Sequence, residues 1–297
     1  NATNLTLNDC DFLSNTVTSS GGAIYRSGGS FNADNCTFTS NTAGRNGGAM
    51  ETGGGVSTIT ECTFSSNKTT STTTPYGLGG AFFITSGTLN LTDCGFLSNV
   101  TTFNGGAVYC DGGTFNADNC TFSDNKANPG VGVNNAGGAV YCKGGTFYAD
   151  QCTFSNNKTD FGGGIYTGGT NLTLNGCDFL NNAVTEYGGA IYRTSGTFNA
   201  DNCTFTSNTA RRGGAIHNHN SFNNIAATIS ECTFSNNAAN DQGGALSIGN
   251  GTLNLTDCGF FSNSSRYGGG AINSGAIATM TFERCHFKEN VSHDGFF

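Results

Sequence analysis

The sequence predicts an all-β fold, a parallel β-helix (solenoid) of about eleven turns with about 26 residues per turn, a period typical of repeat architectures. The pattern Cys-x-Phe-x-x-Asn occurs eleven times, and its shortest step runs from Cys152 to Cys177. A second pattern, Gly-Gly-Ala followed by an apolar residue, lies between these copies. Apolar and polar residues alternate before each Cys, which is the period of a β-strand. Units this small bury an apolar face only by stacking on one another.

Each repeat combines an arc of nearly constant length with an arc of variable length. Most Gly-Gly pairs lie at one fixed distance before the next Cys, as Gly21 does before Cys36, whereas the opposite arc is lengthened at segments 69–77 and 127–135. We expect three short strands per turn: the Gly-Gly-Ala-apolar segment, a Leu-x-Leu segment and the Cys-x-Phe segment. Gly and Asn then form the corners. A propeller or a sandwich is the alternative, but both use hairpin turns and less repetitive units.

The chain repeats one of its own segments almost unchanged. GTLNLTDCGFLSN at 87–99 returns as GTLNLTDCGFFSN at 251–263. We infer one domain, 1–297, in which a block of about six turns was duplicated to give 1–167 and 168–297. A solenoid tolerates such a duplication because each turn contacts only its neighbours. The chain opens inside a repeat, so we expect a processed protein or a piece of a longer one.

Composition excludes several classes of partner. Charged residues make up 11% of the chain, against about 25% in ordinary proteins. The formal net charge of −8 argues against nucleic acid and against anionic lipid. No apolar run approaches the length of a transmembrane helix, so the sequence predicts no membrane span.

The two motifs resemble those of a known family. GGAIY at 21–25 and FLSN at 12–15, repeated in alternation, are similar to the paired GGAI and FxxN repeats of the chlamydial polymorphic outer membrane proteins. The resemblance covers nearly the whole chain. It implies a right-handed parallel β-helix on a cell surface, with a role in adhesion. No segment matches the membrane barrel at the C-terminus of that family.

Two columns of identical residues are expected inside the rod. The Asn five positions after each Cys should stack at a corner, each amide donating to one neighbour and accepting from the other. The eleven aligned cysteines should point inward and behave as small hydrophobic groups. Cys110 and Cys142 lie on adjacent turns and are the candidate disulfide pair, with marginal geometry. Thirteen cysteines is an odd number, so at least one is free or bonded outside the chain.

The residue after Gly-Gly-Ala-apolar should point outward, and in six turns it is aromatic. These residues are Tyr25, Phe83, Tyr109, Tyr141, Tyr166 and Tyr192. One interpretation is mutual stacking that stiffens the rod. The other is a surface stripe on which sugars or a partner chain would stack.

Some N-x-Ser/Thr sequons should face outward, and we expect them to carry N-glycans if the chain is secreted through a eukaryotic route. The candidates are Asn4, Asn35, Asn90, Asn119, Asn171, Asn202 and Asn254. Further sequons, at Asn67, Asn99, Asn157, Asn263 and Asn290, belong to the expected Asn ladder. If the ladder is buried, most of these should stay unmodified.

The sequence predicts no enzyme, no cofactor and no metal site. Some parallel β-helices cleave pectin, and glycoside hydrolysis would need two neighbouring carboxylates. The acids that precede the cysteines, such as Asp93 and Asp257, recur with the repeat, whereas catalytic residues are expected once. His217 and His219 form the single close His pair, and we expect them on a solvated loop.

We therefore predict a secreted structural rod, N-glycosylated, that contributes to an extracellular filament or cell-surface coat. Exposed strand edges at the two ends must be covered. NATNLTL begins directly as a strand and VSHDGFF ends in two exposed Phe, so we expect head-to-tail stacking on other copies, or further turns. The second hypothesis is an adhesin whose aromatic stripe and two long segments contact a carbohydrate or a host-surface ligand. A polysaccharide-acting enzyme is the third.

Overall fold

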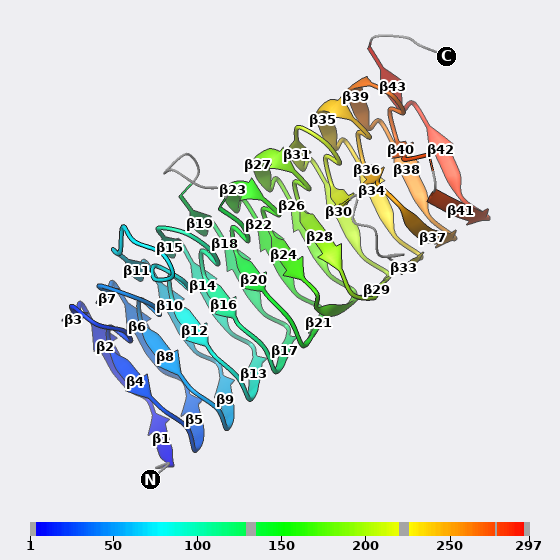
Figure 1. Ribbon diagram of the computed structural model, residues 1–297. Coiled ribbons are helices and arrows are strands. Elements are labelled where there is room, and N and C mark those ends of the chain that lie inside the picture. Colours follow the sequence, from blue (N-terminus) through cyan, green and yellow to red (C-terminus); the bar gives the residue numbers. More distant parts are fainter. Residues whose placement is uncertain (1–3, 129–134, 220–225, 277, 294–297) are drawn as a thin grey trace.

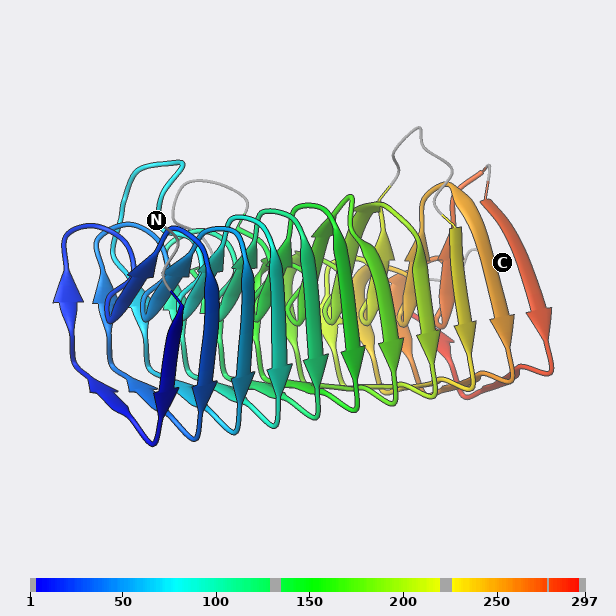
Figure 2. The same cartoon turned by 90° about the horizontal axis from the view of Figure 1, so that it is seen from below.

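The computed structural model describes residues 4–128, 135–219, 226–276 and 278–293. All regular structure in these ranges is β-strand, arranged in four parallel sheets. Figures 1 and 2 show the turns stacked into a rod, with the two ends of the chain at opposite ends. The predicted parallel β-helix of about eleven turns is confirmed. A helical membrane span was not found in the part of the chain that the structure describes.

Sheets A and B contain the Leu-x-Leu and Cys-x-Phe segments, as expected. Sheet A consists of β1 (Leu5–Asn8), β5 (Ser30–Asp34), β9 (Val56–Thr60), β13 (Thr88–Thr92), β17 (Thr114–Asp118), β21 (Thr146–Asp150), β25 (Asn171–Asn175), β29 (Phe198–Asp201), β33 (Ala226–Ser230), β37 (Gly251–Thr256) and β41 (Ala278–Glu283). Sheet B consists of β2 (Asp11–Leu13), β6 (Thr37–Thr39), β10 (Thr63–Ser65), β14 (Gly95–Leu97), β18 (Thr121–Ser123), β22 (Thr153–Ser155), β26 (Asp178–Leu180), β30 (Thr204–Thr206), β34 (Thr233–Ser235), β38 (Gly259–Phe261) and β42 (His286–Lys288).

Sheet D contains the Gly-Gly-Ala-apolar segments, and sheet C was not predicted. Sheet C consists of β3 (Thr16–Val17), β7 (Thr42–Ala43), β11 (Lys68–Thr69), β15 (Val100–Thr101), β19 (Lys126–Ala127), β23 (Lys158–Phe161), β27 (Ala183–Tyr187), β31 (Thr209–Ala210), β35 (Ala238–Gln242), β39 (Ser264–Tyr267) and β43 (Val291–Ser292). Sheet D consists of β4 (Ile24–Arg26), β8 (Met50–Thr52), β12 (Phe82–Ile84), β16 (Val108–Cys110), β20 (Val140–Cys142), β24 (Ile165–Gly168), β28 (Ile191–Ser195), β32 (Ile216–Asn218), β36 (Leu246–Ile248) and β40 (Ile272–Ser274). The expectation of three strands per turn is therefore wrong. A fourth strand follows each corner Asn, and many of its copies are too short to show an alternating pattern.

Each turn closes through corners with left-handed backbone. The residue before each Cys, the residue before each ladder Asn and the first Gly of Gly-Gly have positive φ, as at Asp93 (54°), Ser98 (55°) and Gly105 (70°). The second Gly is needed for a different reason. A Cβ on Gly48 would lie 1.9 Å from the carbonyl oxygen of Gly80 on the next turn, so no side chain fits there.

The interior is a set of stacked columns. The Phe of every Cys-x-Phe segment lies over the Phe of the next turn, with ring centroids 4.6–5.0 Å apart in nearly parallel planes. Leu, Phe, Ile and Ala from sheets A and D complete one continuous core. The inward positions therefore repeat from turn to turn, as the two-residue alternation predicted.

The Asn ladder is present and its central members are fully buried. In a typical step, the backbone N–H and the Nδ2 of Asn41 donate to Oδ1 of Asn67, at 2.9 and 3.0 Å. The same Nδ2 also donates to the carbonyl of Phe12 on the preceding turn, at 2.9 Å. Each amide thus satisfies backbone groups that a sharp corner would otherwise leave unpaired.

The cysteines form a second ladder in which sulfur also serves as a hydrogen-bonding group. The backbone N–H of Cys36 donates to Sγ of Cys62 at 3.3 Å, and Sγ of Cys36 donates to the carbonyl of Asp34 at 3.1 Å. The thiols are therefore more than the small hydrophobic groups that we expected. All thirteen cysteines are free in the structure. Cys110 and Cys142 are direct partners in the register of β16 and β20, so their disulfide stays a prediction for oxidising conditions.

Two arginines occupy equivalent inward positions, Arg26 in segment 1–167 and Arg193 in segment 168–297. Arg26 donates to the carbonyls of Gly28 and Ser30, both at 2.8 Å. Arg193 is fully buried, and it donates to the carbonyl of Gly196 at 2.7 Å. Burial lowers the pKa of Arg193 to about 9. These guanidinium groups hold the corner between sheets D and A.

Strand β24 spans the boundary between 1–167 and 168–297. All four sheets also continue past this boundary without interruption. The duplication itself remains an inference from the sequence. The two terminal Phe of VSHDGFF and most of segment 127–135 lie outside the described residues.

A lengthwise groove as the candidate functional site

The outward residues at the centre of the sheet D strands form one column along the rod, which we call the D column. Strand pairing places each member beside the next. Its members are Tyr25, Glu51, Phe83, Tyr109, Tyr141, Tyr166, Tyr192, His217, Ser247 and Asn273. The column contains all six predicted stripe residues, but also a carboxylate, an imidazole and two small polar groups that the prediction did not include.

The prediction of an exposed aromatic stripe is wrong for all but one of its members. Tyr25 is 63% exposed, whereas Phe83, Tyr109 and Tyr192 are buried and the remaining two are half-buried. From Phe83 to Tyr192, neighbouring rings stack at centroid distances of 4.5–5.3 Å. Because each ring covers the face of its neighbour, these faces are not available to a sugar. The interpretation of mutual stacking is the one that the geometry supports.

A second column runs beside the first, and we call it the C column. It consists of the residue that precedes each of the first nine Gly-Gly pairs: Ser20, Asn46, Leu78, Asn104, Ala136, Phe161, Tyr187, Arg212 and Gln242. Backbone hydrogen bonds place its members in register, since Gly137 N–H donates to the Phe161 carbonyl and Gly162 N–H to the Tyr187 carbonyl. The longer strands β23 and β27 carry these residues out to the edge of sheet C.

Four depressions lie in a row between these two columns, and together we call them the groove. Their volumes, from the N-terminal end, are about 360, 260, 190 and 300 Å³. Each is lined by members of both columns. Tyr76 borders the first two depressions, and Asn104 borders the second and the third, so these three adjoin one another.

The N-terminal half of the groove combines charge with aromatic rings. Burial raises the pKa of Glu51, against the opposing effects of a hydrogen bond from Ser20 and the charge of Arg45. The Arg45 guanidinium lies over the ring of Tyr76, 4.7 Å from its centroid. Segment 69–77 contributes Tyr76 to the second depression, which Phe103 also lines, so this predicted loop does border the groove.

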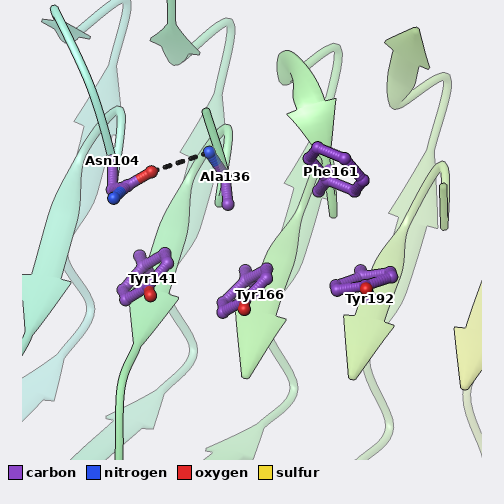
Figure 3. Close-up of a pocket in the computed structure, with 6 residues that line it drawn as sticks. All are labelled: Asn104, Ala136, Tyr141, Phe161, Tyr166 and Tyr192. Atoms are coloured by element: carbon purple, nitrogen blue, oxygen red, sulfur yellow. Dashed lines mark hydrogen bonds between the residues drawn. The ribbon is translucent and has the colours of Figure 1, made fainter. Parts of the chain in front are cut away.

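The centre of the groove holds the smallest of the four depressions, about 190 Å³. Figure 3 shows the rings of Tyr141, Tyr166 and Tyr192 on successive strands, with Phe161 beside them on the neighbouring wall. The centroids of Phe161 and Tyr192 are 5.3 Å apart. Burial raises the pKa of all three tyrosines, so their hydroxyls stay protonated. Asn104 Oδ1 accepts the Ala136 N–H at 2.9 Å, which ties this side chain to the next turn.

The C-terminal depression is polar and contains the two histidines. His217 belongs to β32 and is 6% exposed, so its expected place on a solvated loop is wrong. Its ring stacks on Tyr192 at 5.5 Å and on Tyr187 at 4.8 Å, which extends the aromatic stack by one turn. Burial, with the charges of His219 and Arg212, lowers the pKa of His217 to about 3. His219 Nδ1 is hydrogen-bonded to the Tyr192 hydroxyl at 2.9 Å.

The asparagines of the sequons point outward or inward as the alternation of apolar and polar residues predicted. Asn4, Asn35, Asn119, Asn171, Asn202 and Asn254 are exposed. Asn90 is half-buried, and its Oδ1 accepts a hydrogen bond from Asn116 at 2.8 Å. The ladder sequons Asn67, Asn99, Asn157 and Asn263 are fully buried, and Asn290 is half-buried. Glycosylation at the seven outward positions stays a prediction.

Three of the periodic acids, Asp9, Asp93 and Asp257, have partners on neighbouring turns. Asp9 accepts from Asn35 at 2.7 Å, and Asp257 forms an ion pair with Arg284 at 2.6 Å. No group of three or more His, Cys, Asp or Glu side chains placed to share a metal ion was found in the described residues. These acids are therefore part of the surface ladders of the rod.

Sequence reasoning missed the C column, although a signal for it exists. Its members occupy one fixed position, directly before Gly-Gly, and they change from small polar residues to Phe, Tyr, Arg and Gln along the chain. A position that varies inside an otherwise strict repeat is where recognition would be sought.

Comparisons with known proteins agree with the fold. A family model described as a right-handed beta helix region matches residues 1–147. The model of the Chlamydia polymorphic membrane protein repeat matches 151–168, 176–192, 202–219 and 231–249. Searches of curated proteins and of solved structures each found no match. The predicted resemblance and the right-handed helix are confirmed, and the repeats together with the fold fit a cell-surface protein of the polymorphic membrane protein type.

Proposed function

We propose that this chain is a non-enzymatic rod of a cell-surface protein, and that it binds an extended ligand along the groove between the C and D columns. The observation that carries the proposal is the row of four depressions on one side of the rod, each bordered by the same two columns. The match to polymorphic membrane protein repeats supports a location at the cell surface. Binding of this kind corresponds to the adhesin hypothesis.

The geometry favours a long ligand over a compact one. Successive turns repeat about every 4.8 Å, so the groove offers equivalent positions at a constant step along the rod. Its chemistry nevertheless changes from one turn to the next, from Glu51 through the tyrosines to His217. A ligand lying along the axis would contact these residues one after another, whereas a compact ligand would contact the residues of only one depression.

Secretion and N-glycosylation belong to the same proposal. The six exposed sequons lie on sheet A or at its corners, away from the groove, so glycans there would leave the groove open. The absence of catalysis is also a proposal. It would be overturned by cleavage of pectin-like polymers by the purified chain.

The groove can be filled to test this proposal. Ser247→Trp would place an indole in the C-terminal depression, and Gln242→Trp would do so from the opposite column. Thr228→Trp, on the exposed face of sheet A, is the matched control. We expect beads coated with the wild type or the control to adhere to cultured epithelial cells, and beads coated with either groove variant to lose adhesion. Equal adhesion of all four proteins, with equal thermal stability, would contradict the proposal.

A second proposal concerns the ends of the rod. In the last described turn, Phe282 and Phe287 are nearly half exposed, at 46% and 45%. We propose that such an edge is covered by further turns of a longer chain or by another copy stacked head to tail into a filament. Electron micrographs of the purified chain at physiological salt test the second case. Filaments with a continuous β-helix support stacking, whereas single dispersed rods contradict it.

A further inference from the structure

We propose that the C-terminal depression of the groove is a binding site for one unit of a neutral saccharide, with His217 as its central hydrogen-bonding residue. The inference rests on the proposed function, since it names the ligand class for one part of the groove. The depression has a volume of about 300 Å³ and lies between β32, β36 and β40 on one side and the C column on the other. That volume is near the lower limit of small-molecule sites, which suits a single sugar ring.

The first argument is an unpaired group inside the site. The side chain of His217 is 94% buried and lines the depression, yet its Nδ1 has no hydrogen-bond partner among the described residues. A buried nitrogen without a partner costs free energy comparable to a lost hydrogen bond. Because its pKa is about 3, the ring is neutral at physiological pH and has one donor and one acceptor nitrogen. A hydroxyl-bearing ligand can pair with both kinds of group once the side chains that enclose Nδ1 shift to admit it.

The second argument is the polar wall that faces this ring. Asn273 Nδ2 donates to Gln242 Oε1 over a long 3.4 Å, and the other amide atoms of the two side chains make no hydrogen bond with described residues. Ser247 and Ser274 also border the depression. Amides, hydroxyls and a neutral imidazole together pair well with the vicinal hydroxyls of a sugar.

The charges present disfavour an anionic ligand. The Arg212 guanidinium is already paired with Asp241, with Nε and Oδ2 2.6 Å apart. The net charge of −8 would repel anions from the rod as a whole. Nor is an exposed aromatic face needed, because hydrogen bonds fix the orientation of a polar ligand in such a site. The depression is therefore better suited to neutral hexoses than to uronic acids.

The test is calorimetric titration with cellotetraose, N-acetylchitotetraose, mannotetraose and tetragalacturonate. His217→Phe preserves the aromatic stack but removes both nitrogens, so it should weaken binding about tenfold or more. Gln242→Ala tests the opposite wall, and Thr228→Ala is the control outside the groove. We expect at least one neutral tetrasaccharide to bind, and the control to bind as the wild type does.

Each outcome decides between the inference and the proposed function. No binding of any neutral tetrasaccharide at about 10 mM, or binding that His217→Phe and Gln242→Ala leave unchanged, would overturn the inference. Selective binding of tetragalacturonate would overturn it as well. If sugars fail to bind but the groove-filling variants abolish cell adhesion, the proposed function stands without the inference. If sugars bind and groove filling does not affect adhesion, the inference stands alone.

Discussion

The interior ladders and the groove columns are built on the same turns, yet they follow opposite rules. The inward Cys, Phe and Asn are identical in all eleven repeats, and each hydrogen-bonds to or stacks on its own copy. The D column runs from Tyr25 and Glu51 through a block of rings to His217, Ser247 and Asn273. The comparison indicates that the strict positions carry the fold, and we propose that the positions free to vary carry recognition.

The physical reason lies in where unpaired groups can find partners. Inside the rod, an Asn that lacks its neighbour leaves backbone and amide groups without water, and this is costly. Along the groove, water or a ligand can replace a missing neighbour. A change of residue is therefore tolerated there, and the predictions below compare pairs of positions that differ in this respect.

The largest effect is expected where adjacent turns approach most closely. Gly48→Ala would set a Cβ 1.9 Å from the Gly80 carbonyl oxygen, so we expect a loss of about 4 kcal/mol or more in the free energy of unfolding. Gly112 is the matched control, because a Cβ there meets nothing within 4 Å. Urea denaturation followed by circular dichroism measures both. Equal stability of the two variants would contradict the close packing of turns at Gly-Gly.

Breaking the Asn ladder should have the next largest effect. Asn157 donates to Phe122 and Asn182 and accepts from Asn125. Asn157→Ala should therefore cost about 3 kcal/mol of unfolding free energy, through several buried groups left unpaired. Its neighbour Lys158 is exposed, and Lys158→Ala should stay within about 0.5 kcal/mol. The same denaturation experiment compares them, and a small loss for Asn157→Ala would show that the ladder is dispensable.

The stability lost when an aromatic ring of the D column is removed should depend on how deeply that ring is buried. Tyr141→Ala removes a ring stacked on both sides, at 4.8 and 4.5 Å, and should cost about 2 kcal/mol of stability. Tyr25→Ala removes a ring that is 63% exposed and should cost less than about 0.5 kcal/mol. Thermal melts of the two variants compare the stability lost at a ring covered by its neighbours with the stability lost at a ring on the surface.

The burial of His217 makes a smaller, pH-dependent contribution. Its pKa is about 3 in the folded chain and 6.5 as the ordinary value, so below pH 6.5 the unfolded chain binds a proton that the folded chain does not. Stability should fall with decreasing pH, by at most about 1.4 kcal/mol per unit for this group. The effect is absent above pH 6.5. In thermal melts between pH 7 and 5, stability should depend less on pH in His217→Phe than in the wild type. If the two proteins show the same dependence, the imidazole is exposed to water in the folded chain.

The smallest effect on stability is expected from glycans. Their positions compare the exposed sequons with the buried sequons directly. In chain secreted from a eukaryotic host, glycans should occur at exposed positions such as Asn171 and Asn254. They should be missing from fully buried ladder positions such as Asn67 and Asn157. Mass spectrometry of glycopeptides provides the map. Glycans confined to the ladder would reverse the assignment of inward and outward faces.

The sequence predicts the interior better than the groove, for a physical reason. Strict repetition reveals the Cys and Asn ladders, because each contact is between a residue and its own copy. The second depression, beside Tyr109, depends on Tyr76 and Phe103, which belong to other segments and carry no repeat signal. The burial of His217 likewise depends on Tyr187 in the neighbouring column. Two-residue strands such as β7 show no alternation at all, so sheet C could not be predicted.

A crystal structure of the rod soaked with the tetrasaccharide that binds in calorimetry is the most direct test of the account. We predict a sugar ring between the C and D columns, hydrogen-bonded to His217 and to Gln242 or Asn273, with the chain continuing along the rod axis. A saccharide seated on the outer face of sheet A or sheet B, with the groove filled only by water, would contradict the assignment of recognition to the groove.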